Sequence, residues 1–184
     1  GGGTFDVTLM EIDGKSYRAI ATDGDVYLGG TDWDHRIVDV AADAFMKKYG
    51  GKDPRKDPSA MTRWLHEAED VKRALSAREQ TSYTCDFNDK KLRVPIARAQ
   101  FEELTADLLE RTRFTISSLI GEAGLSWDKI TRLLLVGGST RMPMVQNMLK
   151  EETGRTPDRS LSADEAVAHG AAIYAGLLMA ADQG

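Results

Sequence analysis

The chain has 184 residues, of which 41% are hydrophobic, so it can bury one substantial core or two small ones. Its net charge of −5, with basic residues scattered among acidic ones, argues against a nucleic-acid partner, which requires a clustered basic face. A single cysteine, Cys85, excludes internal disulfides and Cys-based metal sites and favours the reducing cytoplasm. The sequence has no apolar run of spanning length, and we expect no membrane association.

The first residues combine a glycine run with a hydroxyl and a carboxylate: Gly1, Gly2, Gly3, Thr4 and Asp6. Glycines lack a Cβ and therefore let backbone N–H groups approach a phosphate. Proteins rarely begin inside such a loop, so we expect the chain to belong to a longer protein. The alternative is a flexible tail or a cloning remnant, because short glycine-rich matches are weak indicators.

The first half of the chain reads as two strands, two helices and a hairpin. Alternation predicts strands over 5–12 and 17–21, with turns at Gly14 and at 23–25. Helical spacing predicts helices from about Thr31 to Gly50 and from Asp57-Pro58, read as N-cap and first residue, to about Ser76. Asn88-Asp89 predicts a hairpin between 81–87 and 90–94.

The second half reads as helix, strand, helix and helix. We expect one long helix over 98–122, and residues 130–136, which hold the apolar run 133–136, predict a strand covered on both faces. A turn over 137–141 leads to a helix near Pro143, and a last helix over 164–180 carries small residues that permit close packing. We therefore predict an α/β domain (1–31 and 97–184) with a mostly helical insertion and its hairpin (32–96).

The turn after the predicted strand is the best single candidate site. Gly137 and Gly138 give backbone access, Ser139 offers a hydroxyl, and Arg141 a planar guanidinium for a ring face or a phosphate. The alternative is an ordinary strand-to-helix turn in which the hydroxyls only cap the helix.

Four polar residues form one stripe on the second predicted helix: Glu69, Lys72, Arg73 and Ser76. They could hold a nucleoside, but taken alone the pattern favours an exposed face with local ion pairs. Asp164 lies in a capping-box pattern with Ser162 and Glu165, where it either contacts a ligand or complements the helix dipole. The sequence has no paired nucleophile and base and no Walker-type lysine, so it is better equipped to hold a nucleotide than to cleave one.

Six segments in order resemble one family, the DnaK-type seventy-kilodalton heat-shock chaperones, specifically the second lobe of their ATPase domain. The resemblance covers essentially the whole chain, and these segments carry it: 1–7, 28–34, 69–76, 101–104, 135–143 and 164–172. It implies the actin-like ATPase (ribonuclease H-like) fold, with a core subdomain and an inserted outer subdomain. The departures are Thr31 for Glu, Trp33 for Phe, Ala97 for Thr, 162–163 for Asn-Pro, and a short hairpin.

The resemblance assigns roles that the residues alone leave open. Gly1, Gly2, Gly3 and Thr4 resemble a phosphate loop, and Thr4 and Asp6 match catalytic positions near the γ-phosphate, Asp6 also being a metal position. The polar stripe matches the adenosine-holding residues. Gly137, Gly138, Ser139 and Arg141 match the adenosine loop, with Arg141 stacking on adenine, and Asp164 matches a nucleotide-site carboxylate.

The resemblance also implies ligands and partners. They are ATP or ADP with Mg²⁺ and possibly K⁺, an exchange factor, a J-domain co-chaperone and unfolded polypeptides. The family's first phosphate loop, catalytic lysine and lobe-one carboxylates would lie outside this sequence. Two alternatives stay open: an interaction module for an exchange factor over 32–96, or another actin-like ATPase or sugar-kinase relative.

Overall fold

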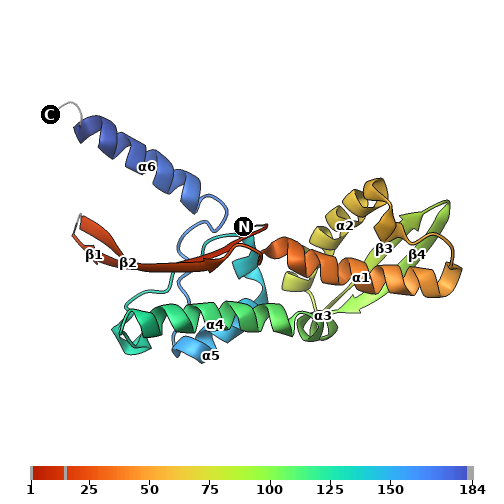
Figure 1. Ribbon diagram of the computed structural model, residues 1–184, viewed down its shortest axis with the longest axis horizontal. Coiled ribbons are helices and arrows are strands. Elements are labelled where there is room, and N and C mark those ends of the chain that lie inside the picture. The colour runs from red at the N-terminus through yellow and green to blue at the C-terminus, as the bar shows by residue number, and fades with distance from the viewer. Residues whose placement is uncertain (1, 15, 182–184) are drawn as a thin grey trace.

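The computed structural model describes residues 2–14 and 16–181, in which two β-hairpins and six α-helices alternate along an elongated molecule (Figure 1). The elements, in order, are β1 (Phe5–Asp13), β2 (Ser16–Asp25), α1 (Gly30–Tyr49), α2 (Pro58–Ala77), β3 (Gln80–Phe87), β4 (Lys90–Ala97), α3 (Arg98–Leu104), α4 (Ala106–Glu122), α5 (Pro143–Thr153) and α6 (Ala166–Ala181). Three short 3₁₀ turns cover Pro54–Lys56, Trp127–Lys129 and Gly138–Arg141.

The first hairpin is longer than the sequence predicted. β1 and β2 pair antiparallel from Phe5↔Asp25 to Asp13↔Ser16, with a bulge at Leu9/Met10. The turn predicted at 23–25 is therefore wrong, because these residues continue β2. Gly24 makes this pairing possible, since a Cβ there would lie 2.4 Å from the carbonyl oxygen of Phe5.

Both predicted helices of the outer unit, defined as α1, α2, β3 and β4, are confirmed. α1 begins after Gly29, whose N–H donates to the Asp32 carboxylate at 2.7 Å, and ends at Gly50 with φ 60°. α2 begins after Asp57, whose carboxylate accepts the N–H of Ala60 at 3.0 Å. These local caps explain why the sequence located both helices within two residues.

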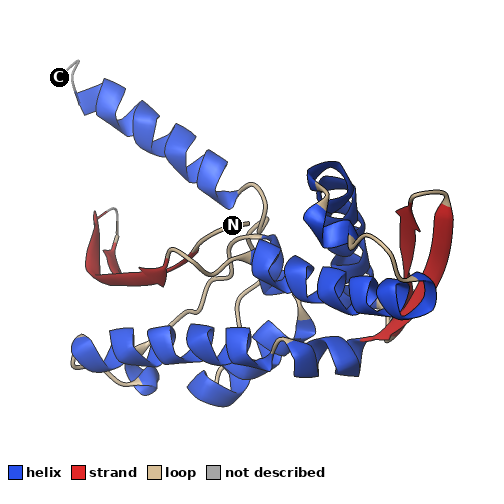
Figure 2. Cartoon of the chain, turned by 45° about the vertical axis from the view of Figure 1, so that its right-hand side comes forward, coloured by secondary structure: helices blue, strands red, loops and turns tan. Residues whose placement is uncertain are grey.

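The second hairpin is confirmed at its turn and extends further than predicted on the β4 side. β3 and β4 pair from Gln80↔Ala97 to Phe87↔Lys90. Asn88 and Asp89 both have positive φ, 50° and 59°, as a type I′ turn requires. Figure 2 shows this hairpin beside the helices of the outer unit.

The long helix predicted over 98–122 is two helices. α3 and α4 meet at Thr105, which is fully buried and donates its hydroxyl to the carbonyl of Phe101 at 2.8 Å. Such side-chain bonding to the preceding turn bends helices. Ala97 precedes α3 without a side-chain cap, as its replacement of Thr implied.

The strand predicted over 130–136 does not form. One isolated parallel bridge joins Leu134 to Asp158, and the Asp158 N–H donates to the Leu133 carbonyl at 2.7 Å. Leu135 is buried, but Leu134 and Val136 are 44% and 41% exposed. A strand needs a neighbour along its length, and in the described residues this segment meets one only at Asp158.

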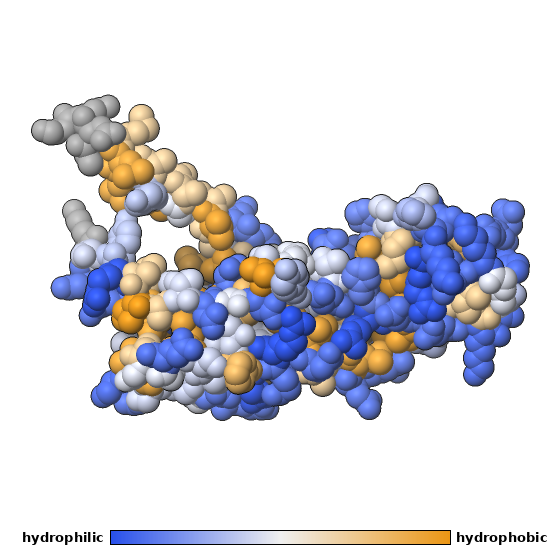
Figure 3. All heavy atoms as spheres, viewed as in Figure 1, coloured by the Kyte–Doolittle hydropathy of each residue, from blue (hydrophilic) through white to orange (hydrophobic). Residues whose placement is uncertain are grey.

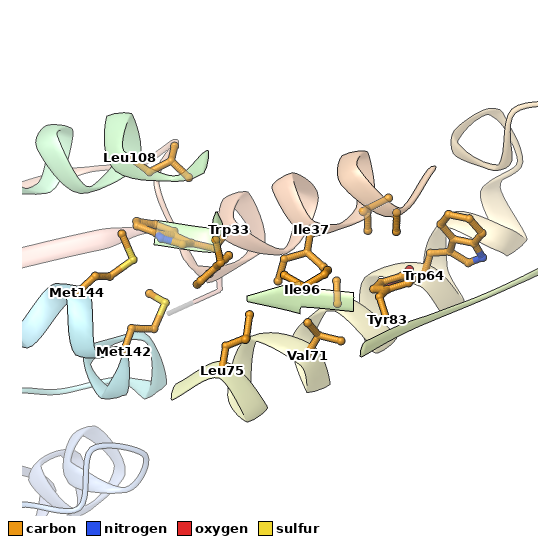
Figure 4. Packing of buried hydrophobic residues seen from close by; sticks show 14 of the residues in the cluster. Trp33, Ile37, Trp64, Val71, Leu75, Tyr83, Ile96, Leu108, Met142 and Met144 are labelled. Atoms are coloured by element: carbon orange, nitrogen blue, oxygen red, sulfur yellow. The ribbon is translucent and has the colours of Figure 1, made fainter. Parts of the chain in front are cut away.

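One hydrophobic core connects the outer unit to α3, α4 and α5. Phe45 and Tyr83 contact Trp64 edge-on, with centroid separations of 5.8 and 5.6 Å, at the outer end of this core. Figure 4 shows the inner end, where Trp33 of α1 lies with Met142 and Met144. A smaller cluster of Leu9, Leu119 and Ile120 joins β1 to α4.

The last helix begins two residues later than predicted and projects away from the other elements (Figures 1 and 2). Residues 167–180 are all exposed, and Figure 3 shows the helix as a largely hydrophobic surface. The close packing expected from its small residues is therefore wrong for the part of the chain described here. Within that part, no helix is both long and apolar enough to cross a membrane.

Candidate functional site

The glycine run lies against the start of α1. The N–H of Thr31 donates to the carbonyl of Gly2 at 2.9 Å. A Cβ on Gly29 would lie 2.3 Å from the same carbonyl oxygen, so Gly29 has to be glycine for this approach. A Cβ on Gly3 would meet nothing within 4 Å, and Gly1 lies outside the described residues.

Thr4 and Asp6 follow at the start of β1. The Thr4 hydroxyl donates to the Asp6 carboxylate at 3.4 Å, and both residues are exposed. Hydroxyl and carboxylate oxygens are the donors that Mg²⁺ prefers. Across residues 2–14 and 16–181, however, no group of three or more His, Cys, Asp and Glu is arranged to hold a metal ion.

The polar stripe on α2 divides into a buried part and an exposed part. The Lys72 ammonium donates to the Gly30 carbonyl at 2.9 Å and contacts the Asp34 carboxylate at 2.8 Å. Arg73 instead pairs with Glu69 at 2.5 Å along the exposed side of the helix. The Ser76 hydroxyl donates to the carbonyl of Lys72 at 3.2 Å.

The structure therefore brings Lys72 to the same place as the glycine run. Gly30, which accepts from Lys72, lies between Gly29 and Thr31, the two residues in contact with Gly2. Burial raises the pKa of Asp34 above its usual range, and the hydrogen bond from Lys72 opposes part of that rise.

The second part of the candidate site is the turn at 137–141. Gly137 has φ 91°, a conformation that favours glycine, and donates its N–H to the Ala163 carbonyl at 2.7 Å. The Thr140 hydroxyl donates back to the Gly137 carbonyl at 2.6 Å, which closes the turn. Ser139 is half-buried in this turn, and its carbonyl accepts the N–H of Met142 at 3.2 Å.

Arg141 and Asp164 meet at this turn. The guanidinium of Arg141 forms an ion pair with the Asp164 carboxylate, and both side chains are more than half exposed. Asp164 Oδ1 would be 3.6 Å from a Cβ on Gly138, so the carboxylate lies against the glycine pair. The capping-box pattern of Ser162 and Glu165 forms no side-chain hydrogen bond among the described residues; instead the Ser162 carbonyl accepts the N–H of Ala166 at 2.9 Å.

The two parts are joined through the core and not through polar contacts. Met142, which follows Arg141, and Leu75, which precedes Ser76, belong to one hydrophobic cluster. Among the described residues, no hydrogen bond or ion pair connects the 137–141 turn with the α2 stripe.

Two residues of the site were not predicted from the sequence. Gly29 lies in a segment that carries the family resemblance, but its contact with Gly2 joins residues far apart in the chain. The position of Asp34 could have been predicted from the sequence, because it falls on the apolar face of the α1 helix, one turn before Val38 and two turns before Ala41. A carboxylate on an apolar face indicates a buried partner.

Comparison with known proteins identifies the class and then the family. A mixed α/β unit with a glycine loop and a second glycine turn is typical of nucleotide-binding domains, and the Hsp70 protein family model matches residues 1–183. The chain belongs to the Hsp70 family, whose ATPase domain has the actin-like fold.

The curated relatives agree with this assignment. The chain is 44% identical to Chaperone protein DnaK of Deinococcus proteolyticus over 97% of its length, which is 29% of that protein. It is 44% identical to DnaK of Deinococcus radiodurans and 42% identical to DnaK of Metamycoplasma hominis, again over 97% of the chain and over 30% and 31% of those proteins. The chain therefore spans about three-tenths of the length of these relatives.

Proposed function

We propose that this chain is an ATP- and ADP-binding lobe of a heat-shock chaperone whose intact form couples ATP hydrolysis to binding and release of unfolded polypeptides. One observation carries the proposal: the glycine run, the start of α1 and Lys72 meet at one place, although they lie far apart in sequence. The family assignment supports nucleotide binding there. The single cysteine, which is buried, is compatible with the cytoplasm.

The proposed roles follow the resemblance. Gly1, Gly2, Gly3 and Thr4 would contact phosphates, and Thr4 and Asp6 would act near the γ-phosphate. The stripe residues and the 137–141 turn would hold the adenosine, with Arg141 against the adenine ring. The residues proposed to hold the adenosine are Glu69, Lys72, Arg73, Ser76, Gly137, Gly138, Ser139, Arg141 and Asp164.

Thr4 and Asp6 offer the oxygen atoms that Mg²⁺ and K⁺ bind, but two residues are too few to complete the coordination of either ion. Thr4 and Asp6 supply two hard oxygen atoms, and the remaining ligands would have to come from phosphates, water or groups outside this chain. When bound, the cation would neutralise phosphate charge. Asp6 would hold it, and the Thr4 hydroxyl would orient the carboxylate.

Nucleotide binding is tested by calorimetric titration of the chain with ADP and Mg²⁺. We expect a dissociation constant weaker than micromolar, because Thr4, Asp6 and the Arg141 side chain, which would contact the nucleotide, are exposed to solvent. Arg141→Ala should weaken this binding, whereas Arg18→Ala, which breaks another exposed ion pair, with Glu11 on the first hairpin, should not. Absence of binding at millimolar ADP would contradict the proposal.

Hydrolysis is a separate question. The described residues offer Thr4 and Asp6 near the proposed phosphate position, and the lysine that approaches it, Lys72, is already engaged by Asp34 and by the Gly30 carbonyl. We expect no measurable ATP turnover by this chain, and release of phosphate above the uncatalysed rate would contradict that expectation.

A second proposed role is protein interaction through the outer unit. One observation favours it: between α2 and β3 lies an open hollow of about 260 Å³, lined by Arg63, Trp64, Glu67, Thr84 and Asp86. We propose residues 32–96 as the surface for a nucleotide-exchange factor, and the intact protein as the partner of a J-domain co-chaperone. Gel filtration with an exchange factor tests the first part, and no shared peak would count against it.

A further inference from the structure

The ion pair between Lys72 and Asp34 differs from the other ion pairs of the α2 stripe because it is buried. The Lys72 and Asp34 side chains are 12% and 10% exposed, whereas those of Arg73 and Glu69 are 69% and 42% exposed. A buried charge is costly unless it is paired, so each group requires the other. The pair therefore fixes one predicted adenosine-side residue, whereas Arg73 and Glu69 lie at the surface.

The position of the Lys72 ammonium is determined by two acceptors on α1. Asp34 supplies a carboxylate oxygen at 2.8 Å, and Gly30 supplies its backbone carbonyl at 2.9 Å. An ammonium group has three N–H donors, so one remains for a further acceptor. Among the described residues, no third acceptor contacts Lys72.

The same ammonium lies directly behind the backbone that contacts the glycine run. Gly30 lies between Gly29 and Thr31. Gly29 approaches the Gly2 backbone closely, and the N–H of Thr31 donates to the carbonyl of Gly2. Displacement of Lys72 would therefore alter the charge beside the proposed nucleotide position. Counted as a whole residue, Asp34 is 7% exposed, and it lies in the first turns of α1 against Lys72.

We propose that Asp34 is a positioning residue, which holds the Lys72 ammonium against α1 so that its third N–H is directed to an oxygen of a bound adenine nucleotide. Asp34 does not contact the nucleotide in this arrangement. The inference rests on the proposed function, because it requires that the chain binds ADP. The alternative is that the ion pair only stabilises the packing of α1 against α2 and has no effect on nucleotide binding.

The experiment compares four variants of the full chain: Asp34→Asn, Lys72→Met, the double variant, and Asp39→Asn as control. Asp39 is also on α1, but it pairs with Arg55 away from the glycine run. Asp34→Asn preserves shape and removes charge. If it fails to fold, the double variant still tests the pair, because replacing both members of a buried ion pair is often tolerated.

Two readouts separate positioning from bracing. The first is the ¹⁵N-detected ammonium signal of Lys72 without ligand, which burial should protect from solvent exchange in the parent chain and which Asp34→Asn should abolish. The second is ADP affinity by chemical-shift titration. Asp34→Asn and Lys72→Met should each weaken ADP binding by roughly fivefold, and the double variant should be no weaker than Lys72→Met.

Each other outcome overturns the proposal in a distinguishable way. Unchanged ADP affinity in Asp34→Asn, together with lower thermal stability, would show that the pair only stabilises the packing of α1 against α2. Additive losses in the double variant would show that Asp34 does not act through Lys72. If the parent chain fails to bind ADP, the proposed function fails first and this inference fails with it.

Discussion

A Cβ atom on Gly29 would lie 2.3 Å from the carbonyl oxygen of Gly2, closer than a side-chain carbon can approach a backbone oxygen. The backbones of Gly2 and Gly29 therefore lie side by side at the start of α1, where the Lys72 ammonium also donates to the Gly30 carbonyl. The candidate phosphate loop and the buried lysine therefore share one structural support.

Gly29→Ala should lower the free energy of unfolding by about 2 kcal/mol, because the methyl group meets backbone atoms that cannot rotate away. For a chain of this size we expect the Tm to fall by roughly 5 °C. Thermal unfolding followed by circular dichroism measures the change. Gly121→Ala is the control: it has open space on α4 and should be neutral or slightly stabilising, so a similar loss there would contradict this explanation.

Asp89→Gly should stabilise the chain by about 0.5–1 kcal/mol. Asp89 adopts φ 59° in the turn between β3 and β4, and glycine adopts this conformation without the penalty of a Cβ. Chemical denaturation should show a higher midpoint with an unchanged slope. Asn88→Ala should have the opposite effect, and a stabilising result there would argue against a type I′ turn.

Stability should fall as the pH drops below about 4, and Asp57 should carry part of that loss. Its pKa is lowered in the folded chain because the carboxylate accepts the N–H of Ala60 and pairs with Lys52. The stabilisation it gives is therefore complete above the unfolded pKa and disappears as the pH falls through the lower folded value.

Asp57→Asn tests this assignment. Asparagine keeps an oxygen that can cap α2 but does not titrate, so the variant should lose less stability than the parent between pH 6 and pH 3, roughly the window set by an ordinary aspartate. Urea unfolding at both pH values measures the difference. Equal losses in the two proteins would assign the acid sensitivity to other carboxylates, such as Asp25 or Asp53, whose pKa values are also lowered by hydrogen bonds.

Cys85 should resist thiol reagents in the folded chain. The residue is fully buried beneath α1, and burial raises the pKa of its thiol to about 12. At pH 8 only about one thiol in 10⁴ would be ionised, even where the reagent had access. Labelling with a chromogenic disulfide should be slow in buffer and fast in urea. Rapid labelling without denaturant would contradict the buried position.

The features that the sequence predicted well are those whose signals lie within a few residues. Asp57-Pro58 locates the start of α2, Gly50 the end of α1, and Asn88-Asp89 the second hairpin, because caps and turns are local in the chain. The resemblance added the candidate site, since ordered motifs carry information that single patterns do not.

Tertiary contacts decided the rest. At the break between α3 and α4, Thr105 is fully buried against Met144, 39 residues later in the chain. The absence of a strand at 130–136 depends on which backbone lies beside it. The stripe on α2 looked like an exposed face, yet Lys72 is largely removed from solvent and pairs with Asp34, 38 residues earlier. By itself the sequence determined the locally capped helix ends, the second hairpin turn and the family to which the chain belongs. Only the fold determined which polar groups are paired out of water, because pairing and desolvation depend on neighbours that are distant along the chain.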